Sequence, residues 1–218
     1  MSIKTIENFI EPDFREWLEW FWHQLPDKCD TGQKTRTFLH HQLPWNRRLH
    51  DKLYSMIAPY EKKDFSISTA YLSDDYAPGG IHSDGFLPSY PEKHLSHTYL
   101  VPLAYEGKQH TIVFDQTSQE AVTLNSALGM GNAGIVNYRQ VDPQTVLRDK
   151  GFHISPEIYN EYLTHLSYEC LQGLTISSIL TWNLDAAVCW PREHFHCAAN
   201  YLAGQQRFAL IMMTCYID

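Results

Sequence analysis

The sequence contains no apolar run long enough to cross a membrane. No stretch approaches the roughly 18 consecutive apolar residues that a transmembrane helix requires. The segment Met1–Glu7 also lacks the long apolar core of a secretory signal peptide. We therefore expect a cytoplasmic protein that makes no membrane contact.

Paired cysteines are missing as well. The five cysteines are scattered and form no C-x-x-C pair, which argues against a disulfide scaffold and against a cysteine zinc knuckle. We expect them to be reduced and mostly buried as small apolar residues. A Gly-x-Ser-x-Gly nucleophile elbow is absent too, and Cys197 has no identifiable activating partner, so a serine or cysteine hydrolase is disfavoured.

Positive charge is scarce. Lysine and arginine total 17 against 25 acidic residues, which gives a formal net charge of −8. The basic patches at 46–48 and 61–63 are short, whereas phosphate contacts need clustered lysine and arginine. The sequence gives no support for nucleic-acid binding.

The remaining composition is that of a folded domain. Hydrophobic residues make up 44% and aromatic residues 13% of the 218 positions, which argues against disorder. We find no internal repeat, no low-complexity run and no linker. The length suits one domain that spans residues 1–218.

The spacing of apolar residues predicts helices first and strands afterwards. Apolar residues recur at helical spacing from Pro12 to Leu25 and again between Pro44 and Pro59, so residues 1–63 are predicted to supply support helices after a short strand at 3–6. Short strand-like runs then follow at 65–71, 81–84, 97–103, 111–114, 174–180, 186–190, 195–201 and 207–215.

One long interruption separates the two groups of strands. Residues 117–173 are first rich in glycine and asparagine and then show helical signals at 143–150 and 156–166. We interpret this insertion as a lid over the substrate or as an oligomer contact. Residues 64–116 and 174–215 then form the β core. This order predicts a mainly β fold of the jelly-roll type, a double-stranded β-helix with flanking helices.

The tripeptide His82-Ser83-Asp84 places an imidazole and a carboxylate two positions apart. On a strand, residues two apart point to the same face, so these side chains would converge on one point. In a chain with 12 histidines such a tripeptide also arises by chance, and alone it is more simply read as a surface histidine bonded to an aspartate. Its position after a strand and the Pro78-Gly79-Gly80 turn places it at the rim of a sheet.

A histidine near the C-terminus would complete a metal site. His194 and His196 precede the apolar run 207–215, and either would give two histidines and one carboxylate. That donor set is typical of non-haem iron(II) oxygenases and leaves coordination positions open. Arg207 begins the apolar run, where a guanidinium is costly unless it meets an anion; a dicarboxylic acid would satisfy it.

On these residues the chain resembles the 2-oxoglutarate/Fe(II)-dependent dioxygenase superfamily, and within it the prolyl-hydroxylase-like branch. The likeness covers roughly residues 64–116 and 174–215. The insertion at 117–173 exceeds what a minimal core of that family needs. The matching residues are Tyr71, His82-Ser83-Asp84, the strand 111–114, His196 and Arg207-Phe208-Ala209.

The resemblance implies that His82, Asp84 and His196 bind Fe(II), and that Arg207 and Tyr71 bind 2-oxoglutarate. Dioxygen would be the co-substrate. The reaction would convert 2-oxoglutarate to succinate and CO2 and would hydroxylate a C–H bond of a small-molecule or peptide substrate whose identity the sequence does not reveal. Through the insertion, the protein could also form a homo-oligomer.

Several residue roles stay open on the sequence alone. Periodicity does not separate His196 from His194, although the spacing to Arg207 favours His196. Tyr99 competes with Tyr71 as a contact of 2-oxoglutarate. Arg207 could instead reach solvent at a strand start. The sequence also allows Asn200 near the metal ligands and a zinc pair of His94 and His97.

Two further functions compete with the oxygenase. A cupin-type metalloenzyme would share the β-sandwich and would suit His194-x-His196, but cupins place their paired histidines first in the chain. A catalytically silent jelly-roll binding module would share only the fold. The presence of a candidate at each ligand position, together with Arg207, argues against a silent module.

Overall fold

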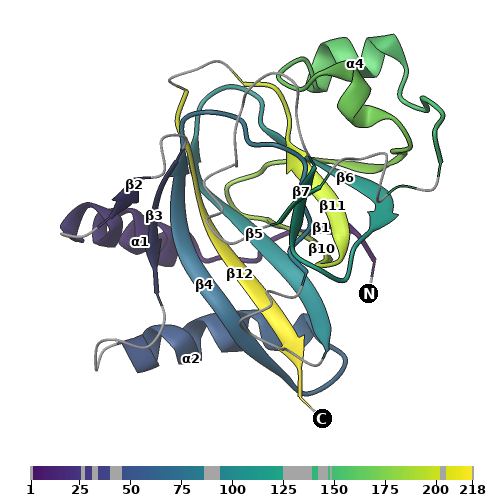
Figure 1. The fold of residues 1–218 in the computed structure, drawn as a ribbon. Helices are drawn as coiled ribbons and strands as arrows, with labels where there is room; N and C mark the ends of the chain where they lie inside the picture. The colour runs from purple at the N-terminus through teal and green to yellow at the C-terminus, as the bar shows by residue number, and fades with distance from the viewer. Residues whose placement is uncertain are drawn as a thin grey trace.

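The computed structural model describes residues 2–25, 28–30, 34–39, 46–85, 94–124, 139–141, 147, 149–201 and 205–217. This part of the chain is mainly β. Its strands form a large and a small antiparallel sheet, with helices outside them (Figure 1). The predicted jelly-roll fold is confirmed.

The larger sheet contains seven strands, and every neighbouring pair in it is antiparallel. Their order across the sheet is β1, β10, β5, β12, β4, β3, β2. Strand β12 is buried along nearly its whole length, which explains why its sequence is apolar throughout instead of alternating. The strands are β1 (Lys4–Ile6), β2 (Cys29–Asp30), β3 (Lys34–Phe38), β4 (Phe65–Asp75), β5 (Leu95–Tyr105), β10 (Ala187–Pro191) and β12 (Arg207–Tyr216).

The smaller sheet has three described strands in the order β11, β6, β9. These are β6 (His110–Thr117), β9 (Ile176–Thr181) and β11 (His194–Ala198), and a separate parallel pair consists of β7 (Val122–Leu124) and β8 (Arg139–Val141). Between β7 and β11, His82 forms single bridges to Thr123 and to His196. The predicted metal motif is therefore held at the edge of the small sheet.

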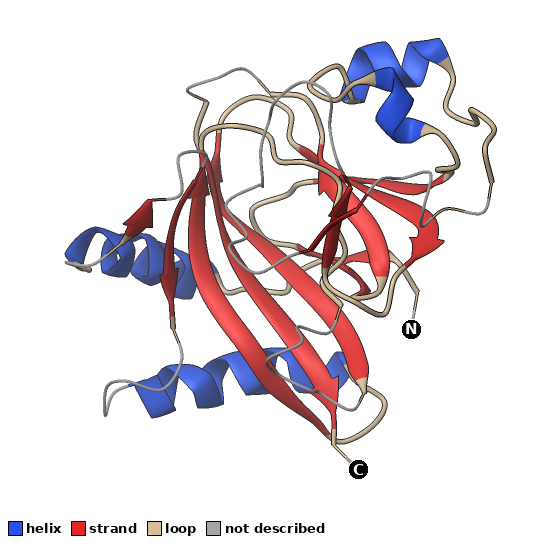
Figure 2. Cartoon of the chain, in the orientation of Figure 1, coloured by secondary structure: helices blue, strands red, loops and turns tan. Residues whose placement is uncertain are grey.

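The helices lie outside the sheets (Figure 2). Helix α1 buries Leu18, Phe21 and Trp22, and α2 buries Leu53 and Ile57, in one core with the large sheet. Each predicted N-terminal helix is thus confirmed within about two residues at its ends. None of the helices in the described residues is long and apolar enough to span a membrane. The helices are α1 (Pro12–Gln24), α2 (Asn46–Ile57) and α4 (Pro156–Tyr162), with short 3-10 turns η1 (Ala58–Tyr60) and η2 (Tyr168–Leu171).

A second core lies on the small sheet. Leu163, Leu166 and Leu171, which belong to the predicted insertion, pack with Ile112 and Phe195 of that sheet. The described part of residues 117–173 is therefore anchored by apolar burial. The predicted helix at 156–166 is present as the shorter α4, whereas most of the one predicted at 143–150 lies outside the described residues. The role of this segment as a lid or oligomer contact stays a prediction.

Two errors in the predicted secondary structure concern the site. The run 81–84 is not a strand: its backbone is extended but bonds in turn to separate segments, with Ser83 N donating to Val122 O and Asp84 N to Arg192 O, both at 3.0 Å. The second error concerns residues 28–39, for which apolar spacing predicts no strand. They contain β2 and β3, and β3 pairs with β4 at the side of the large sheet.

Candidate active site

Three of the predicted site residues converge on one point. His82 and Asp84 follow β4, His196 lies on β11, and one ligand atom from each of the three residues lies within 4.8 Å of the other two. His196 Nε2 lies 3.5 Å and His82 Nε2 4.0 Å from the Asp84 carboxylate. The backbones of His82 and His196 exchange hydrogen bonds of 2.8 and 3.0 Å, which fix this approach. We name these three residues the His–Asp–His triad.

Both imidazoles of the triad are oriented through their Nδ1 atoms. Nδ1 of His82 lies 3.0 Å from the carbonyl oxygen of Gly80, and Nδ1 of His196 lies 3.0 Å from that of His194. A carbonyl only accepts, so each Nδ1 carries the proton and each Nε2 keeps a lone pair for a metal. Burial, followed by the neighbouring His196, lowers the pKa of His82 to about 3, and burial also lowers the pKa of His196. The rings are therefore neutral, as metal ligation requires.

The Asp84 carboxylate is kept ionised. Burial alone would raise its pKa, but His196 and His82 and a hydrogen bond from Thr98 outweigh burial and lower it. Thr98 Oγ1 on β5 donates to Asp84 Oδ2 at 2.8 Å. Arg192 Nε donates to the Asp84 backbone carbonyl at 3.0 Å and so fixes the main chain at this residue. The triad thus offers two neutral nitrogens and one anionic oxygen, the donor set that suits Fe(II).

We predict that a Thr98→Val variant binds Fe(II) about 10-fold more weakly than the wild type, because loss of a hydrogen bond that orients a ligand usually costs about 10- to 100-fold. Valine keeps the shape of threonine but cannot donate to Asp84. Anaerobic metal titration measures the effect. Thr69→Val, at a half-buried position of β4, is the matched control. An unchanged affinity in Thr98→Val would show that Thr98 does not orient the carboxylate.

Gly85 allows the chain to pass close to residues 119–120. A Cβ at Gly85 would lie 2.4 Å from the Glu120 carbonyl carbon and 2.5 Å from the Gln119 oxygen. Ser83, two residues earlier, is held at the same place because its hydroxyl donates to Glu120 O at 2.8 Å. The backbone on both sides of Asp84 is thus packed against one segment.

We therefore predict that Gly85→Ala lowers the free energy of unfolding by about 1–3 kcal/mol, the usual cost of overpacking. It should also weaken metal binding, because Asp84 must shift with the backbone. Gly80→Ala is the control, since its Cβ would meet nothing closer than 3.6 Å. Urea unfolding of both variants measures the difference. Equal stabilities would show that the close approach at Gly85 is not a constraint.

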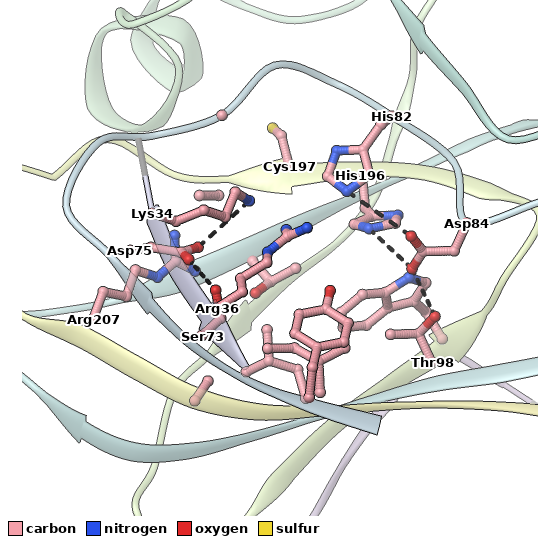
Figure 3. Close-up of a pocket in the computed structure, with 18 of the residues that line it drawn as sticks. Lys34, Arg36, Ser73, Asp75, His82, Asp84, Thr98, His196, Cys197 and Arg207 are labelled. Atoms are coloured by element: carbon pink, nitrogen blue, oxygen red, sulfur yellow. Dashed lines mark hydrogen bonds and ion pairs between the residues drawn. The ribbon is translucent and has the colours of Figure 1, made fainter. Parts of the chain in front are cut away.

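A pocket between the two sheets connects the triad with Arg207 (Figure 3). Arg207 is only 3% exposed, and its Nη2 donates to the carbonyl oxygen of His110 at 3.0 Å. The rings of Trp182 and Tyr201 cover the guanidinium, at 4.1 and 5.3 Å from Cζ. Its Nε and Nη1 are buried and have no hydrogen-bond partner among the described residues. Since unpaired buried donors are costly, an anion would be a suitable partner for this end of the pocket.

The two tyrosines and His194 are clearly distinguished by their surroundings. Tyr71 lines the pocket, and burial raises the pKa of its hydroxyl to about 12, so it stays protonated. Tyr99 instead donates to Glu61 at 3.0 Å and does not line the pocket. His194 turns its Nδ1 to the carbonyl oxygen of Phe114, 2.7 Å away, and is not among the described residues that could share a metal with the triad.

Asn200, His97 and His94 lie outside the metal site. Asn200 Oδ1 accepts from the backbone N–H of His165 at 3.2 Å. His97 is buried against Glu61, with 3.2 Å between Nδ1 and Oε1, while His94 is exposed. Within the described part of the chain, the triad is the cluster that could hold a metal, and His94 and His97 form no such cluster. Arg207, the last of the residues whose role the sequence left open, does not reach solvent.

Sequence reasoning missed several polar residues of the pocket region. Lys34 and Arg36 of β3 and Thr98 of β5 line the pocket, and the buried Tyr201 hydroxyl interacts with Arg207. The alternation in Lys34-Thr35-Arg36-Thr37-Phe38, with two β-branched threonines, is the strand signal that could have found β3.

The sequence matches no protein-family model and no curated protein, but the fold matches solved structures. The carbocyclase SnoK of nogalamycin biosynthesis, a non-haem α-ketoglutarate-dependent enzyme, has a TM-score of 0.58 at 11% identity, over all of this chain and 81% of that one. The epimerase SnoN of the same biosynthesis, also α-ketoglutarate-dependent, gives 0.56 at 12% identity, over 99% of this chain and 78% of that one.

HygX from Streptomyces hygroscopicus was solved with nickel, 2-oxoglutarate and hygromycin B bound. It gives a TM-score of 0.56 at 11% identity and covers 99% of this chain and 83% of that one. At such low identity the likeness establishes the fold alone. The chain therefore has the jelly-roll fold of the 2-oxoglutarate/Fe(II)-dependent oxygenases.

Proposed function

We propose that the protein is an Fe(II)- and 2-oxoglutarate-dependent dioxygenase that hydroxylates its substrate. In this reaction 2-oxoglutarate, dioxygen and a C–H bond yield succinate, CO2 and an alcohol. The observation that carries the proposal is the pairing of two features in one pocket: a neutral–neutral–anionic metal donor set, and a buried guanidinium with two unpaired N–H groups.

The donor set fits iron on chemical grounds. Two imidazoles and one carboxylate occupy one side of a metal and leave positions for a chelating 2-oxo acid and dioxygen. Bound iron with 2-oxoglutarate supplies the oxidising power, while the chain supplies orientation. Thr98 and the carbonyl oxygens of Gly80 and His194 hold the three ligand side chains in place. Trp190 packs on the His196 ring at 4.7 Å between centroids and shields it from solvent.

The other end of the pocket fits a carboxylate. Arg207 offers Nε and Nη1, and the buried hydroxyl of Tyr201 lies beside the guanidinium and interacts with it. A carboxylate accepts such a fork bidentately. Tyr71, kept protonated by burial, is a further donor that lines the pocket. A dicarboxylic acid that chelates the metal with one end would satisfy these donors with the other.

The test is a spectrum of the anaerobic protein with Fe²⁺ and 2-oxoglutarate. We expect a visible metal-to-ligand charge-transfer band, because a 2-oxo acid that chelates Fe(II) absorbs there. If metal binds but the band is absent, the protein does not use 2-oxoglutarate, and a cupin-type metalloenzyme becomes the better explanation. If neither binds, a silent jelly-roll binding module is left. Succinate release across compound classes would then identify the substrate.

A further inference from the structure

Strand β3 adds a second cationic group to the pocket that iron and 2-oxoglutarate do not use in the proposed reaction. Residues two apart on a strand share a face, and Lys34 and Arg36 of β3 both line the pocket. They stand opposite Asp75 and Ser73 of β4 in the antiparallel register. Figure 3 shows both side chains extending toward the pocket on the side of Arg207 and the triad.

The positive charge of Lys34 is balanced by a carboxylate. Its Nζ lies 3.9 Å from Asp75 Oδ2, and both groups are well covered. Asp75 also accepts a hydrogen bond from Ser73 at 2.5 Å. Burial, opposed by Asp75 and reinforced by Arg36 and Arg207, lowers the pKa of Lys34 to about 8. Lys34 and Asp75 therefore form a nearly neutral pair.

The Lys34–Asp75 pair does not neutralise Arg36, whose orientation is fixed by another residue. Its guanidinium stacks over the Tyr71 ring, 4.8 Å from the centroid, which fixes the plane of the group. Its Nε is buried and has no hydrogen-bond partner among the described residues. A pre-oriented guanidinium with an unpaired buried donor is a binding group for a planar anion.

The charges that line the pocket indicate what that anion should be. The described residues that line the pocket include three cations, Lys34, Arg36 and Arg207, and two carboxylates, Asp75 and Asp84. Their net charge is +1, and Fe²⁺ raises it to +3. A bound 2-oxoglutarate dianion lowers it to +1 again. Excess positive charge in a pocket favours one more anion of single charge.

We propose that Arg36 binds the carboxylate of the primary substrate, and that the substrate of this protein is a monocarboxylic acid. The inference rests on the proposed function, because it assumes that Arg207 is occupied by 2-oxoglutarate. A monocarboxylate matches the remaining charge and the planar fork of Arg36, whereas a phosphate monoester carries nearly two charges at neutral pH.

The experiment uses acetate as the probe and Mn²⁺ in place of iron. Mn²⁺ shortens the proton relaxation times of small molecules that bind near it, and no turnover takes place. With Mn²⁺ and saturating 2-oxoglutarate bound, the wild type should shorten the proton relaxation times of acetate, and the effect should saturate with acetate concentration. The relaxation times of the neutral isostere acetamide should not change. In Arg36→Gln the affinity for acetate should fall at least 10-fold. Arg48→Gln, an exposed arginine on α2, is the matched control and should behave as wild type.

The affinity for 2-oxoglutarate is measured by calorimetry on the same proteins. It distinguishes a failure of the proposed function from a failure of the Arg36 assignment. If wild type does not bind 2-oxoglutarate, the proposed function fails. If it binds 2-oxoglutarate but does not relax acetate, or if Arg36→Gln retains acetate binding, the assignment of Arg36 fails alone. A 10-fold loss of 2-oxoglutarate affinity in Arg36→Gln would overturn the proposal by placing Arg36 on the co-substrate.

Discussion

An Asp84→Ala variant is expected to bind Fe(II) at least about 100-fold more weakly than the wild type and to lose the charge-transfer band with 2-oxoglutarate. Loss of a residue that only orients a ligand already costs about 10- to 100-fold, and Asp84 is the one anionic member of the triad. Two neutral imidazoles would remain, and they provide no charge to balance a divalent cation in a buried site. Anaerobic titration followed by absorbance measures both effects.

The control for this variant is Asp115→Ala, which removes an exposed carboxylate from β6. The metal-free Asp84→Ala protein should stay folded, since the hydrogen bond that it loses from Thr98 contributes about 1 kcal/mol. Thermal unfolding without metal checks this. If a folded Asp84→Ala protein bound Fe(II) as tightly as the Asp115→Ala control, the triad would not be the metal site.

The convergence of the triad could be anticipated from the sequence because its members lie in patterns of short range. His82 and Asp84 are two positions apart, and Arg207 opens an apolar run that follows His196. Periodicity could not choose between His194 and His196, because the register of β11 against β6 shifts between these two residues. That shift turns His194 toward the carbonyl oxygen of Phe114, and only the folded backbone reveals it.

The contribution of Lys34 and Arg36 of β3 to the pocket could not be predicted from the sequence. A five-residue strand between two helices has little local signal, and its pairing with β4 joins segments about 35 residues apart, such as Thr37 and Leu72. The same limit applies to Thr98, whose bond to Asp84 depends on the position of β5. Local patterns thus predicted the candidate metal ligands, while tertiary pairing determined the residues that support them.

An Arg207→Met variant is expected to bind 2-oxoglutarate about 100-fold more weakly, a change of about 2.8 kcal/mol at about 1.4 kcal/mol per tenfold. Methionine fills similar volume but offers no donor to a carboxylate. Calorimetry on the Ni²⁺-loaded protein measures the affinity without turnover. Metal binding should change little, because Arg207 lies outside the triad. Arg48→Met, on the exposed side of α2, is the control.

Stability distinguishes a binding role of Arg207 from a structural one. Without 2-oxoglutarate, burial of a cation with two unpaired N–H groups is costly. The free energy of unfolding of Arg207→Met should therefore lie within about 1 kcal/mol of the wild-type value or above it. 2-Oxoglutarate at about 100 times its dissociation constant should raise the free energy of unfolding of the wild type by about 2.7 kcal/mol and that of the variant hardly at all. A structural arginine would behave differently: its loss would cost about 3–5 kcal/mol whether or not 2-oxoglutarate is present. That outcome would remove the main support for 2-oxoglutarate as the co-substrate, since the unpaired N–H groups would then have no ligand to explain them.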